Sequence, residues 1–267
     1  MFKNRKFDPN RLIYPRVPLV FIFLGIPLIT YFIGVSLKGI LISALCFFLF
    51  DGLGVQIGVH KHLCHRSFQT HKFIRRFLAF LSILSSQGSP MVWVAVHTGS
   101  HHPHADTDMD IHAPNKGLWF AFLAWYWRAD LRLINFQVCR EYLKDKVLVF
   151  LHRHHTVILF SYWICLAVFG GPFWLAYAGL LPAGVSVILA GVVNAFLHSK
   201  GRVSEMTFQK YQNYSTDVGY NSFWVGLLTM GLGLHNNHHH DPARCYYDVK
   251  WYEFDPSRLV IPFIRKR

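Results

Sequence analysis

Charged side chains are scarce in this chain, and long stretches lack them entirely. Asp, Glu, Lys and Arg together make up 15% of the 267 residues, whereas 52% are hydrophobic. A soluble domain typically carries about 25% charged residues, so an ordinary soluble protein with a large core is excluded. No charge occurs at residues 19–37 or 156–197, and only Asp51 interrupts residues 39–59. These runs indicate membrane-spanning helices.

The uncharged runs have the length that a membrane crossing requires. A hydrocarbon core of roughly 30 Å is crossed by about 20 apolar residues in a helix. The run at 156–197 accommodates two crossings with a turn near Gly179–Pro182, since glycine and proline favour chain reversal. We predict an all-α membrane protein, a single integral-membrane domain over residues 1–267, with four transmembrane helices in two hairpins. The predicted spans are 19–37, 39–59, 156–177 and 179–198.

Acidic residues are fewer than basic ones, and the basic residues lie outside the predicted spans. Lys and Arg number 27 against 14 Asp and Glu, and the two hairpin turns contain only Lys38. The positive-inside rule therefore places both termini and the segment between the hairpins in the cytoplasm. There they are expected to form a helical cap from residues 60–155 and 199–267. This distribution argues against nucleic-acid binding as the reason for the positive charge. The first run lacks a small-residue cleavage site and is predicted to be a retained span.

Cysteine is also scarce, and short apolar segments occur in the expected cap. The five cysteines include no CxxC pair, and most face the reducing side, so no disulfide is predicted. Residues 77–84 are too few for a span and predict an interfacial helix. Residues 118–127 are dense in aromatics, which suits either the headgroup level or packing against the spans.

Histidine is abundant, with 17 residues, and nine of them lie beside the apolar runs. These nine are His60, His65, His97, His101, His102, His198, His235, His238 and His239. Neutral imidazole binds iron, zinc, copper or nickel, and nine ligands exceed what one ion accepts. The count therefore predicts a dinuclear metal site without naming the metal or the reaction. A metal transporter or storage protein would place its histidines within the spans, whereas these lie at their cytoplasmic ends.

Helical periodicity gives an expected direction for several of these side chains. In a continuing α-helix, His60 and His65 are separated by about 140° around the axis and would reach two different metals. Spacings of four and five residues put His97 and His101 on one face, with His102 beside them.

The histidine motifs resemble those of membrane-bound fatty acyl desaturases of the acyl-CoA type, in particular bacterial members. The motifs are GVHKHLCHRSF at 58–68, WVAVH followed by HH, DTDMDIHAP, NAFLH, GLGLHNNHH and the trailing WYEFDPSRL. The resemblance extends from about the first span to Pro256. It implies that the nine histidines bind two iron ions and that Asn194 contacts one iron through water.

The same resemblance implies an activity and its partners. The expected reaction is O2-dependent introduction of a cis double bond into a saturated acyl chain, at the delta-9 position. The expected location is the bacterial inner membrane, with membrane lipid around the spans and the active site in the cytoplasm. The substrate is a fatty acyl group carried as a CoA thioester, another thioester or a lipid, with CoA favoured. Because the chain has no ferredoxin-like cysteine set and no haem domain, electrons come from a separate ferredoxin, rubredoxin or cytochrome b5 type donor.

Four further residues are candidates for substrate binding. Ala44 and Phe48 precede His60 by multiples of four residues and are expected to shape the closed end of an acyl tunnel. Arg75 and Arg76 are expected to bind the phosphate of an acyl carrier. Ordinary packing within a span and contact with anionic lipid are the alternatives for these pairs.

The chain departs from the family pattern in two places. The second box reads HTGSHH instead of HxxHH, with one extra residue between His97 and His101. A π-bulge would absorb this residue, and otherwise His104 is the substitute ligand. Leu232 and Leu234 replace the acid and the aromatic residue of the bacterial GEGWHNNHH. These changes leave a related hydroxylase or acetylenase as the alternative activity.

The remaining histidines are not expected to bind metal. His152, His154 and His155 precede the third span and have no counterpart among the family's ligands, so an interfacial position is expected. The others adjoin the boxes as hydrogen-bond partners or surface residues, and they include His62, His71, His112 and His240.

Overall fold

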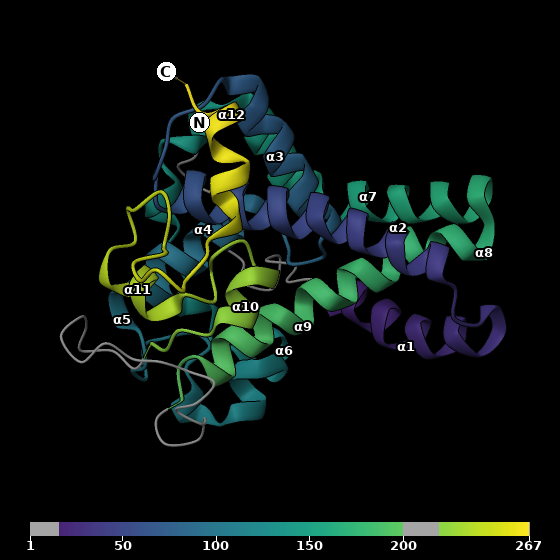
Figure 1. The fold of residues 1–267 in the computed structure, drawn as a ribbon, viewed down its shortest axis with the longest axis horizontal. Coiled ribbons are helices and arrows are strands. Elements are labelled where there is room, and N and C mark those ends of the chain that lie inside the picture. Colours follow the sequence, from purple (N-terminus) through teal and green to yellow (C-terminus); the bar gives the residue numbers. More distant parts are fainter. Residues whose placement is uncertain (1–15, 200–218, 267) are drawn as a thin grey trace.

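The computed structural model of the chain describes residues 16–199 and 219–266, and this part is helical. Its only β-type contacts are two isolated bridges, Thr70 with Arg265 and Asn221 with Leu234. Long helices extend together to one side, and the shorter elements gather at the other end (Figure 1). The predicted all-α class is confirmed for the described residues. Residues 1–15, with the basic residues that precede Arg16, and residues 200–218 of the expected cap lie outside them.

The first helical hairpin joins α1 (Arg16–Ile33) to one long helix, formed by α2 (Leu37–Phe47) and the π-helical η2 (Phe48–Cys64). Gly34 takes a φ of +73° in the connection, a backbone conformation that glycine adopts without steric cost. Ser36 caps α2 by accepting a hydrogen bond from the backbone N–H of Gly39. Tyr177 donates its hydroxyl to the Gly34 carbonyl at 2.7 Å, which ties this turn to the second hairpin.

The second hairpin reverses at Gly170 and Gly171. Its first arm comprises α7 (Lys146–Cys165) and η9 (Leu166–Gly170), and its second comprises α8 (Gly171–Trp174), η10 (Leu175–Leu180) and α9 (Leu181–Phe196). Gly171 has a φ of +76°, and the Tyr162 hydroxyl donates across the two arms to the Ala178 carbonyl at 2.9 Å.

The predicted turn near Gly179–Pro182 is therefore wrong, and with it the predicted boundary between the third and fourth spans. A Cβ atom on Gly179 would lie 3.1 Å from the Trp163 ring, so this glycine permits close packing of the two arms. Pro182 lies just after the point where η10 passes into α9, and the backbone stays helical there, so the chain does not reverse at this proline.

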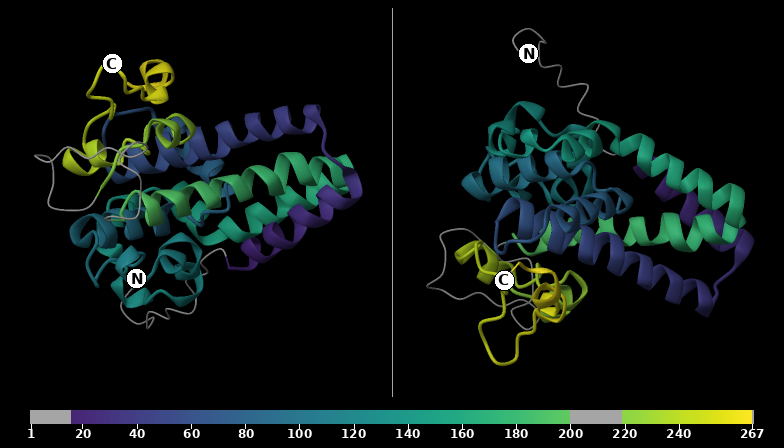
Figure 2. Two further views of the ribbon diagram at one scale, coloured as in Figure 1. Left: turned by 60° about the horizontal axis from the view of Figure 1, so that its bottom comes forward. Right: turned by 90° about the horizontal axis from the view of Figure 1, so that it is seen from above.

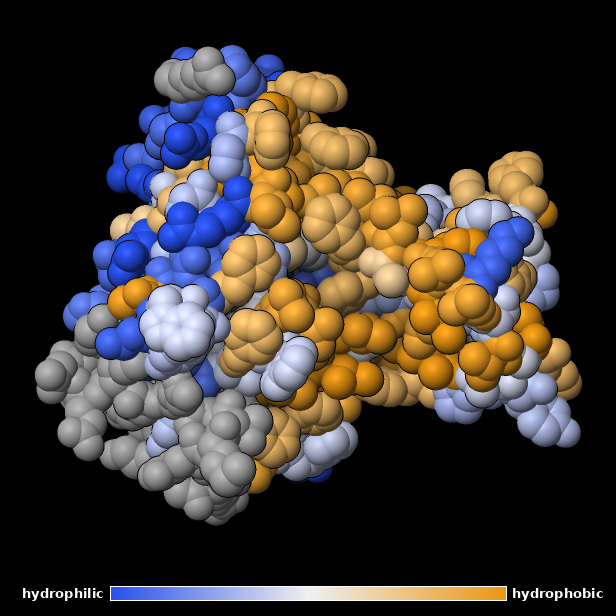
Figure 3. Space-filling view, in the orientation of Figure 1, coloured by the Kyte–Doolittle hydropathy of each residue, from blue (hydrophilic) through white to orange (hydrophobic). Residues whose placement is uncertain are grey.

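Two helical stretches, Leu37–Cys64 and Lys146–Phe196, are long and apolar enough to cross a membrane, and the second is the one that folds back at Gly171. Hydrophobic residues cover the extended helices, whereas hydrophilic residues gather at the opposite end (Figure 3). The same separation between the extended helices and the broader end is visible from two further sides (Figure 2). This distribution suits a protein whose helical end is embedded in lipid.

Helix α3 (Lys72–Leu84) packs directly on η2. A Cβ atom on Gly54 would collide with the backbone of Ser82, and one on Gly58 would lie 2.5 Å from Leu78 Cβ. The opposite side of α3 exposes Phe73 and Phe77, whose rings stack with centroids 6.5 Å apart. An amphipathic helix with exposed aromatic residues agrees with the predicted interfacial position.

The other described elements build the broader end of the molecule. The aromatic segment at 118–127 is divided, since Trp125 and Tyr126 are buried whereas Trp119 is 62% exposed. The segment forms η5 (Phe120–Ala124) and α6 (Trp125–Arg128), and its aromatic residues are partly packed in the interior and partly exposed at the surface.

The bounds of the elements at this end are α4 (Pro90–Val96), η3 (His97–His101), α5 (His102–His104), η4 (Pro114–Lys116), η5 (Phe120–Ala124), α6 (Trp125–Arg128), η6 (Leu131–Leu133), η7 (Phe136–Cys139), η8 (Tyr142–Lys144), α10 (Phe223–Leu228), α11 (His235–His240), η11 (Pro256–Leu259) and α12 (Ile261–Ile264).

A buried ion pair joins the end of η2 to the C-terminal segment. Lys61 Nζ lies 2.8 Å from Asp255 Oδ2, and both side chains are fully buried. The same ammonium donates to the Cys245 carbonyl at 3.2 Å and lies 3.5 Å from the centroid of the Tyr247 ring. These contacts hold residues 245–255 against the helix that carries His60.

Candidate metal centre

The nine histidines come from four separate parts of the chain and meet in one place. Helix η2 supplies His60, and His65 follows its last residue. His198 follows the end of α9. The remaining six lie on η3, α5 and α11, and are His97, His101, His102, His235, His238 and His239. The sequence prediction that these boxes converge is confirmed.

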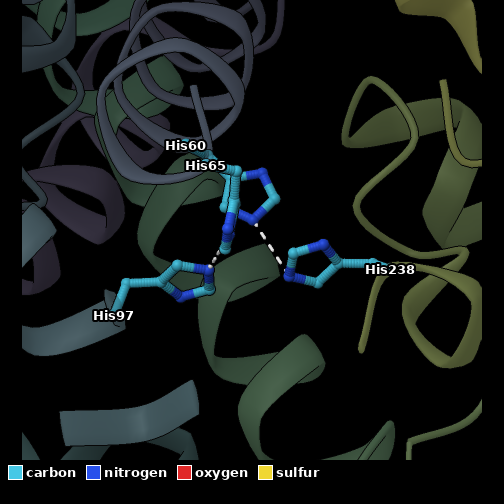
Figure 4. Close-up of side chains that lie close together, drawn as sticks. All are labelled: His60, His65, His97 and His238. Carbon is cyan, nitrogen blue, oxygen red and sulfur yellow. Dashed lines mark hydrogen bonds between the residues drawn. The ribbon is translucent and has the colours of Figure 1, made fainter. Parts of the chain in front are cut away.

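The imidazoles form two groups. In each group the possible ligand nitrogens all lie within 4.8 Å of one another. Rings from three elements turn toward a common point in the first group (Figure 4). His102 lies between the groups and gathers with His238 and His239. The first group is His60, His65, His97 and His238, and the second is His101, His198, His235 and His239.

His60 and His65 belong to the same group, which corrects the expectation that they would reach two metals. The expectation used the 100° per residue of an α-helix. Helix η2 is instead a π-helix, in which the backbone bonds to the residue five positions back, so positions i and i+5 come to one side. The His65 backbone N–H accordingly donates to the His60 carbonyl at 3.1 Å.

The extra residue of the second box is absorbed by a π-turn, as predicted. Helix η3 spans His97–His101, and the His102 backbone N–H donates to the His97 carbonyl five residues earlier. This turn brings His102 Nε2 to 3.1 Å from His97 Nε2. His97 and His101 consequently enter different groups, contrary to the expectation that they share a face. His104 is exposed and belongs to neither group.

Partners at Nδ1 fix the orientation of three rings. Asp110 Oδ2 lies 2.9 Å from His101 Nδ1, and Asp106 Oδ1 lies 2.9 Å from His198 Nδ1. His235 Nδ1 lies 3.2 Å from the Leu232 carbonyl. Because these carboxylate and carbonyl oxygens accept hydrogen bonds, each Nδ1 carries a proton, and in the neutral ring Nε2 presents a lone pair.

The two aspartates are functional residues that spacing alone did not reveal, although both lie in the DTDMDIHAP motif. Leu232 stands where the bacterial motif has an acid, and this change leaves the orientation of His235 intact. The backbone carbonyl of Leu232, independent of its side chain, orients His235.

The donor set fits a metal cation. His198 Nε2 and His235 Nε2 lie 2.6 Å apart, although both atoms carry lone pairs by the argument above. Burial lowers the pKa of His235 well below the usual histidine value, and neighbouring imidazoles lower it further, so a shared proton is disfavoured. Two nitrogens bound at right angles to one ion, each about 2.1 Å away, lie ~3 Å apart. A cation between the lone pairs therefore accounts for the convergence.

Neutral imidazole is also favoured at His238 and His239 of α11. Burial lowers the pKa of His238 and of His239, and adjacent histidines contribute in the same direction. Neutral rings are the form that ligates iron, zinc, copper or nickel.

A cavity opens beside the candidate metal centre. His97, His101 and His235 form part of its wall, and Asn194 of α9 lines it as well. Most of the remaining wall is apolar or aromatic, from Val92, Trp93, Val96, Trp125, Tyr126, Ala190, Val193 and Leu232. Such a lining is typical of a site for an apolar ligand.

Ala44 and Phe48 do not line this cavity, contrary to the expectation for the tunnel end. Both side chains are exposed, with 38% of Phe48 accessible. The expectation counted back from His60 in steps of four residues, but four residues do not complete a whole number of turns in an α-helix or in the π-helical η2, so the positions drift off one face over three or four steps. Sequence reasoning missed two polar residues of the wall, Gln56 and Gln87.

Arg75 and Arg76 both pair with one carboxylate. Arg75 Nη2 lies 2.6 Å from Asp145 Oδ2, and Arg76 Nη2 lies 3.1 Å from Asp145 Oδ1. Asp145 also caps α7 by accepting from the Val147 backbone N–H. The two arginines thus have a structural role at the junction of α3 and α7. Together with Asp145 they leave one net positive charge.

The histidines of α7 lie away from both groups. The His152 ring lies within hydrogen-bond distance of Ser89 Oγ, at 2.7 Å, and His154 is exposed beside Phe150. No metal-ligand group among the described residues includes His152, His154 or His155.

The fold and site together are those of a helical protein with apolar helices and a candidate histidine metal centre beside an apolar cavity. The family model for fatty acid desaturase matches residues 17–256. The sn-1 stearoyl-lipid 9-desaturase of Anabaena variabilis is 28% identical over 226 residues, which cover 84% of this chain and 79% of that protein. The chain therefore belongs to the fatty acid desaturase family and is an oxidoreductase acting on acyl lipids.

Two further relatives differ in the acyl carrier that their names give. The sn-2 palmitoyl-lipid 9-desaturase of Nostoc sp. (strain 36) is 28% identical over 223 residues, covering 81% of this chain and 75% of that protein. The acyl-CoA C20 Delta5-desaturase of Anemone leveillei is 27% identical over 229 residues, covering 82% of this chain and 70% of that protein.

Proposed function

We propose that this protein is an O2-dependent di-iron desaturase that introduces a cis double bond at the delta-9 position of a saturated acyl chain. The observation that carries the proposal is the pair of histidine groups opening onto one apolar cavity. The first group would hold one iron and the second group the other, with His102 beside both. Asn194, which lines the cavity, is proposed to contact one iron through water.

The chemistry that bound iron supplies is the oxidation of two adjacent unactivated methylenes with O2. In the balanced reaction the acyl chain loses two hydrogens, and O2 becomes two water molecules on taking up these together with two electrons and two protons. The electrons are proposed to come from a separate ferredoxin, rubredoxin or cytochrome b5 type donor, because the reaction consumes one pair in each cycle.

The protein's own residues bind the chain and exclude water. Val92 and Val96 of α4 and Val193 of α9 place apolar surface beside His97. An acyl chain bound there displaces water from the reacting carbons and is oriented by the walls of the cavity. Asp106 and Asp110 hold their histidines in the ligating orientation.

The acyl carrier is proposed to be a lipid or a CoA thioester, the two carriers that the names of the relatives give. Arg75 and Arg76, whose charge Asp145 neutralises in part, are proposed to contribute to its phosphate site only through their remaining positive charge. Four membrane spans, with the metal centre on the cytoplasmic side, are proposed from the charge distribution and from the two helical hairpins.

Expression in a host that lacks its own desaturase tests this function. Mass spectrometry of cellular acyl chains is expected to show new monoenes, and the purified protein is expected to contain two irons. His238→Ala should abolish both, whereas His154→Ala, on the exposed side of α7, should preserve both. Hydroxylated chains without alkenes would assign the protein to the related hydroxylases instead. Retention of metal after loss of His60, His198 and His238 together would overturn the site.

A further inference from the structure

An apolar surface lies outside the extended helices, on α3 and near the C-terminal end of the described chain. Phe73 of α3 is 77% exposed, and Phe77 stacks beside it. Phe263 of α12 is 86% exposed, and Leu259 at the end of η11 is exposed as well. We call these four residues the α3–α12 surface. Exposed apolar residues gathered in one region mark a contact surface.

Helices α3 and α12 are joined in the interior and at their ends. Ile261 of α12 is fully buried in a hydrophobic cluster that also contains Leu78 of α3. Thr70, two residues before α3, donates its hydroxyl to the Ile264 carbonyl at 2.5 Å and forms an antiparallel bridge with Arg265. Each helix therefore buries one side in the protein, and the exposed side chains of both belong to one fixed region.

Three cations in this region have no acidic partner among the described residues. Lys72 is the first residue of α3, and Arg265 and Lys266 follow α12. All three are exposed, and no described carboxylate forms an ion pair with them. Arg258 of η11, by contrast, pairs with Asp248 at 2.6 Å. Exposed cations at a membrane surface attract anionic headgroups.

The α3–α12 surface continues the apolar surface of the extended helices. Helix α12 lies beside α3 where the extended helices begin, whereas α5 and α11 lie farther from them (Figure 1). Hydrophobic side chains continue from the extended helices over this region, and hydrophilic ones follow beyond it (Figure 3). Aromatic residues combined with cations, next to helices in lipid, are typical of a surface that lies in the membrane interface.

We propose that the α3–α12 surface lies in the interface of the bilayer and binds anionic phospholipid. Phe73 and Phe263 insert among the acyl chains, and the three unpaired cations bind the headgroups. The proposal rests on the extended helices being embedded in lipid, as proposed above, and does not depend on the reaction. It extends the interfacial position expected for α3 to the C-terminal helix.

Photocrosslinking in nanodiscs tests the contact. The full chain is prepared with p-benzoylphenylalanine in place of Phe263, Leu41 or Trp251, one position at a time, and mass spectrometry identifies the adduct at each. Lipid adducts are expected at Phe263 and at Leu41, which is 63% exposed on α2. Trp251 is 94% exposed in the segment between α11 and α12, which lies farther from the extended helices than α12 does, so few are expected there (Figure 1).

The headgroup of the adduct tests the role of the cations. The nanodiscs contain phosphatidylcholine with about 20% phosphatidylglycerol. At Phe263 the ratio of phosphatidylglycerol to phosphatidylcholine among adducts should exceed that of the bilayer about fivefold, the effect of one cation at an anionic surface. At Leu41 the ratio should equal that of the bilayer.

Two double variants identify the cations. Arg265→Gln with Lys266→Gln removes two of the three charges and keeps the backbone bridge at position 265, and the excess at Phe263 should fall to about twofold or less. Arg244→Gln with Lys250→Gln removes the same charge from the exposed segment between α11 and α12. This matched control should leave the excess unchanged.

The outcomes separate this inference from the proposals above. Lipid adducts at Leu41 but not at Phe263 would overturn the inference and leave the membrane spans and the desaturase function intact. Adducts of protein mass at Phe263 would also overturn it, because another protein or a second copy would then cover the surface. So would equal lipid labelling at Trp251, or an excess that the first double variant does not lower. If neither Leu41 nor Phe263 yields lipid adducts, the proposed spans are wrong as well.

Discussion

Breaking the buried pair of Lys61 and Asp255 should destabilise the protein strongly. Loss of one partner of a buried ion pair costs about 3–5 kcal/mol, because the other charge stays buried without compensation. In Lys61→Met the Asp255 carboxylate keeps the Tyr247 backbone N–H at 2.8 Å and the Ser257 backbone N–H at 2.9 Å. The Ser257 hydroxyl also remains, at 2.6 Å. The expected cost is therefore near the lower end, ~3 kcal/mol.

Asp255→Asn should cost more than Lys61→Met. The buried ammonium then loses its compensating negative charge and keeps neutral partners, which include the Cys245 carbonyl and the face of the Tyr247 ring. An expected loss of ~4–5 kcal/mol follows from the same range. Because the Tyr247 ring lies 4.7 Å from the His238 ring between centroids, the loss should also loosen the first histidine group and lower its metal content.

Thermal unfolding in detergent, followed by tryptophan fluorescence, measures both effects. For a protein of this size each kcal/mol shifts the midpoint by about 2–4 °C, so Lys61→Met should lower Tm by roughly 6–12 °C. The double variant should be more stable than the sum of the single losses predicts, by about 2 kcal/mol, because the two side chains interact directly. Arg132→Met is the matched control, since its ion pair with Asp130 is exposed and little change is expected.

Two results would refute this reasoning. Shifts of less than about 2 °C in both single variants would mean that water reaches the pair. Strict additivity in the double variant would mean that the two side chains do not interact.

Three further predictions concern the metal centre and the junction of α3 and α7. Asp110→Asn should weaken metal binding about 10–100-fold in a chelator competition, and unchanged affinity would contradict its role in orienting His101. Gly99→Ala should lower Tm, because the new Cβ would lie 2.6 Å from the Asn135 carbonyl oxygen, and an unchanged Tm would argue against this close approach. Although burial opposes it, hydrogen bonds from Arg76 and Arg75 hold the pKa of Asp145 below its usual value. The contribution of Asp145 to stability is then present above about pH 4 and is lost as the pH falls further. In Asp145→Ala, Tm should therefore fall less steeply with decreasing pH than in the unchanged protein. The same decrease of Tm with pH in both proteins would contradict this role of Asp145.

Residue type explains why much of the molecule is predictable from its sequence. A lipid environment requires long uncharged runs, and a metal centre requires imidazoles, so helical segments and the nine convergent histidines are visible without a structure. The π-turn at His97–His101 is predictable for a different reason. The motifs on either side keep their usual spacing, so the extra residue has to be accommodated locally.

The helical period of η2 was not predictable in the same way. Its residues are as compatible with an α-helix as with a π-helix, and close packing of Gly54 and Gly58 on α3 favours neither from the sequence alone. The wrong period led to the separation of His60 from His65. The choice of Ala44 and Phe48 for the cavity wall has another cause, because steps of four residues drift off one face in either kind of helix. The hairpin turn was misplaced because glycine has two different uses that look the same in a sequence. Gly179 permits close packing of two helices, whereas Gly171 adopts the positive φ of the turn.

The π-turn of the second box bears on how such proteins are recognised. A widened turn accepts one inserted residue without rotating the helix that follows, so His97 and His102 still face each other at 3.1 Å. Spacing between histidines can therefore drift during evolution while the three-dimensional cluster is kept. A search pattern with a fixed HxxHH interval would pass over this chain, whereas a search for converging imidazoles would find it.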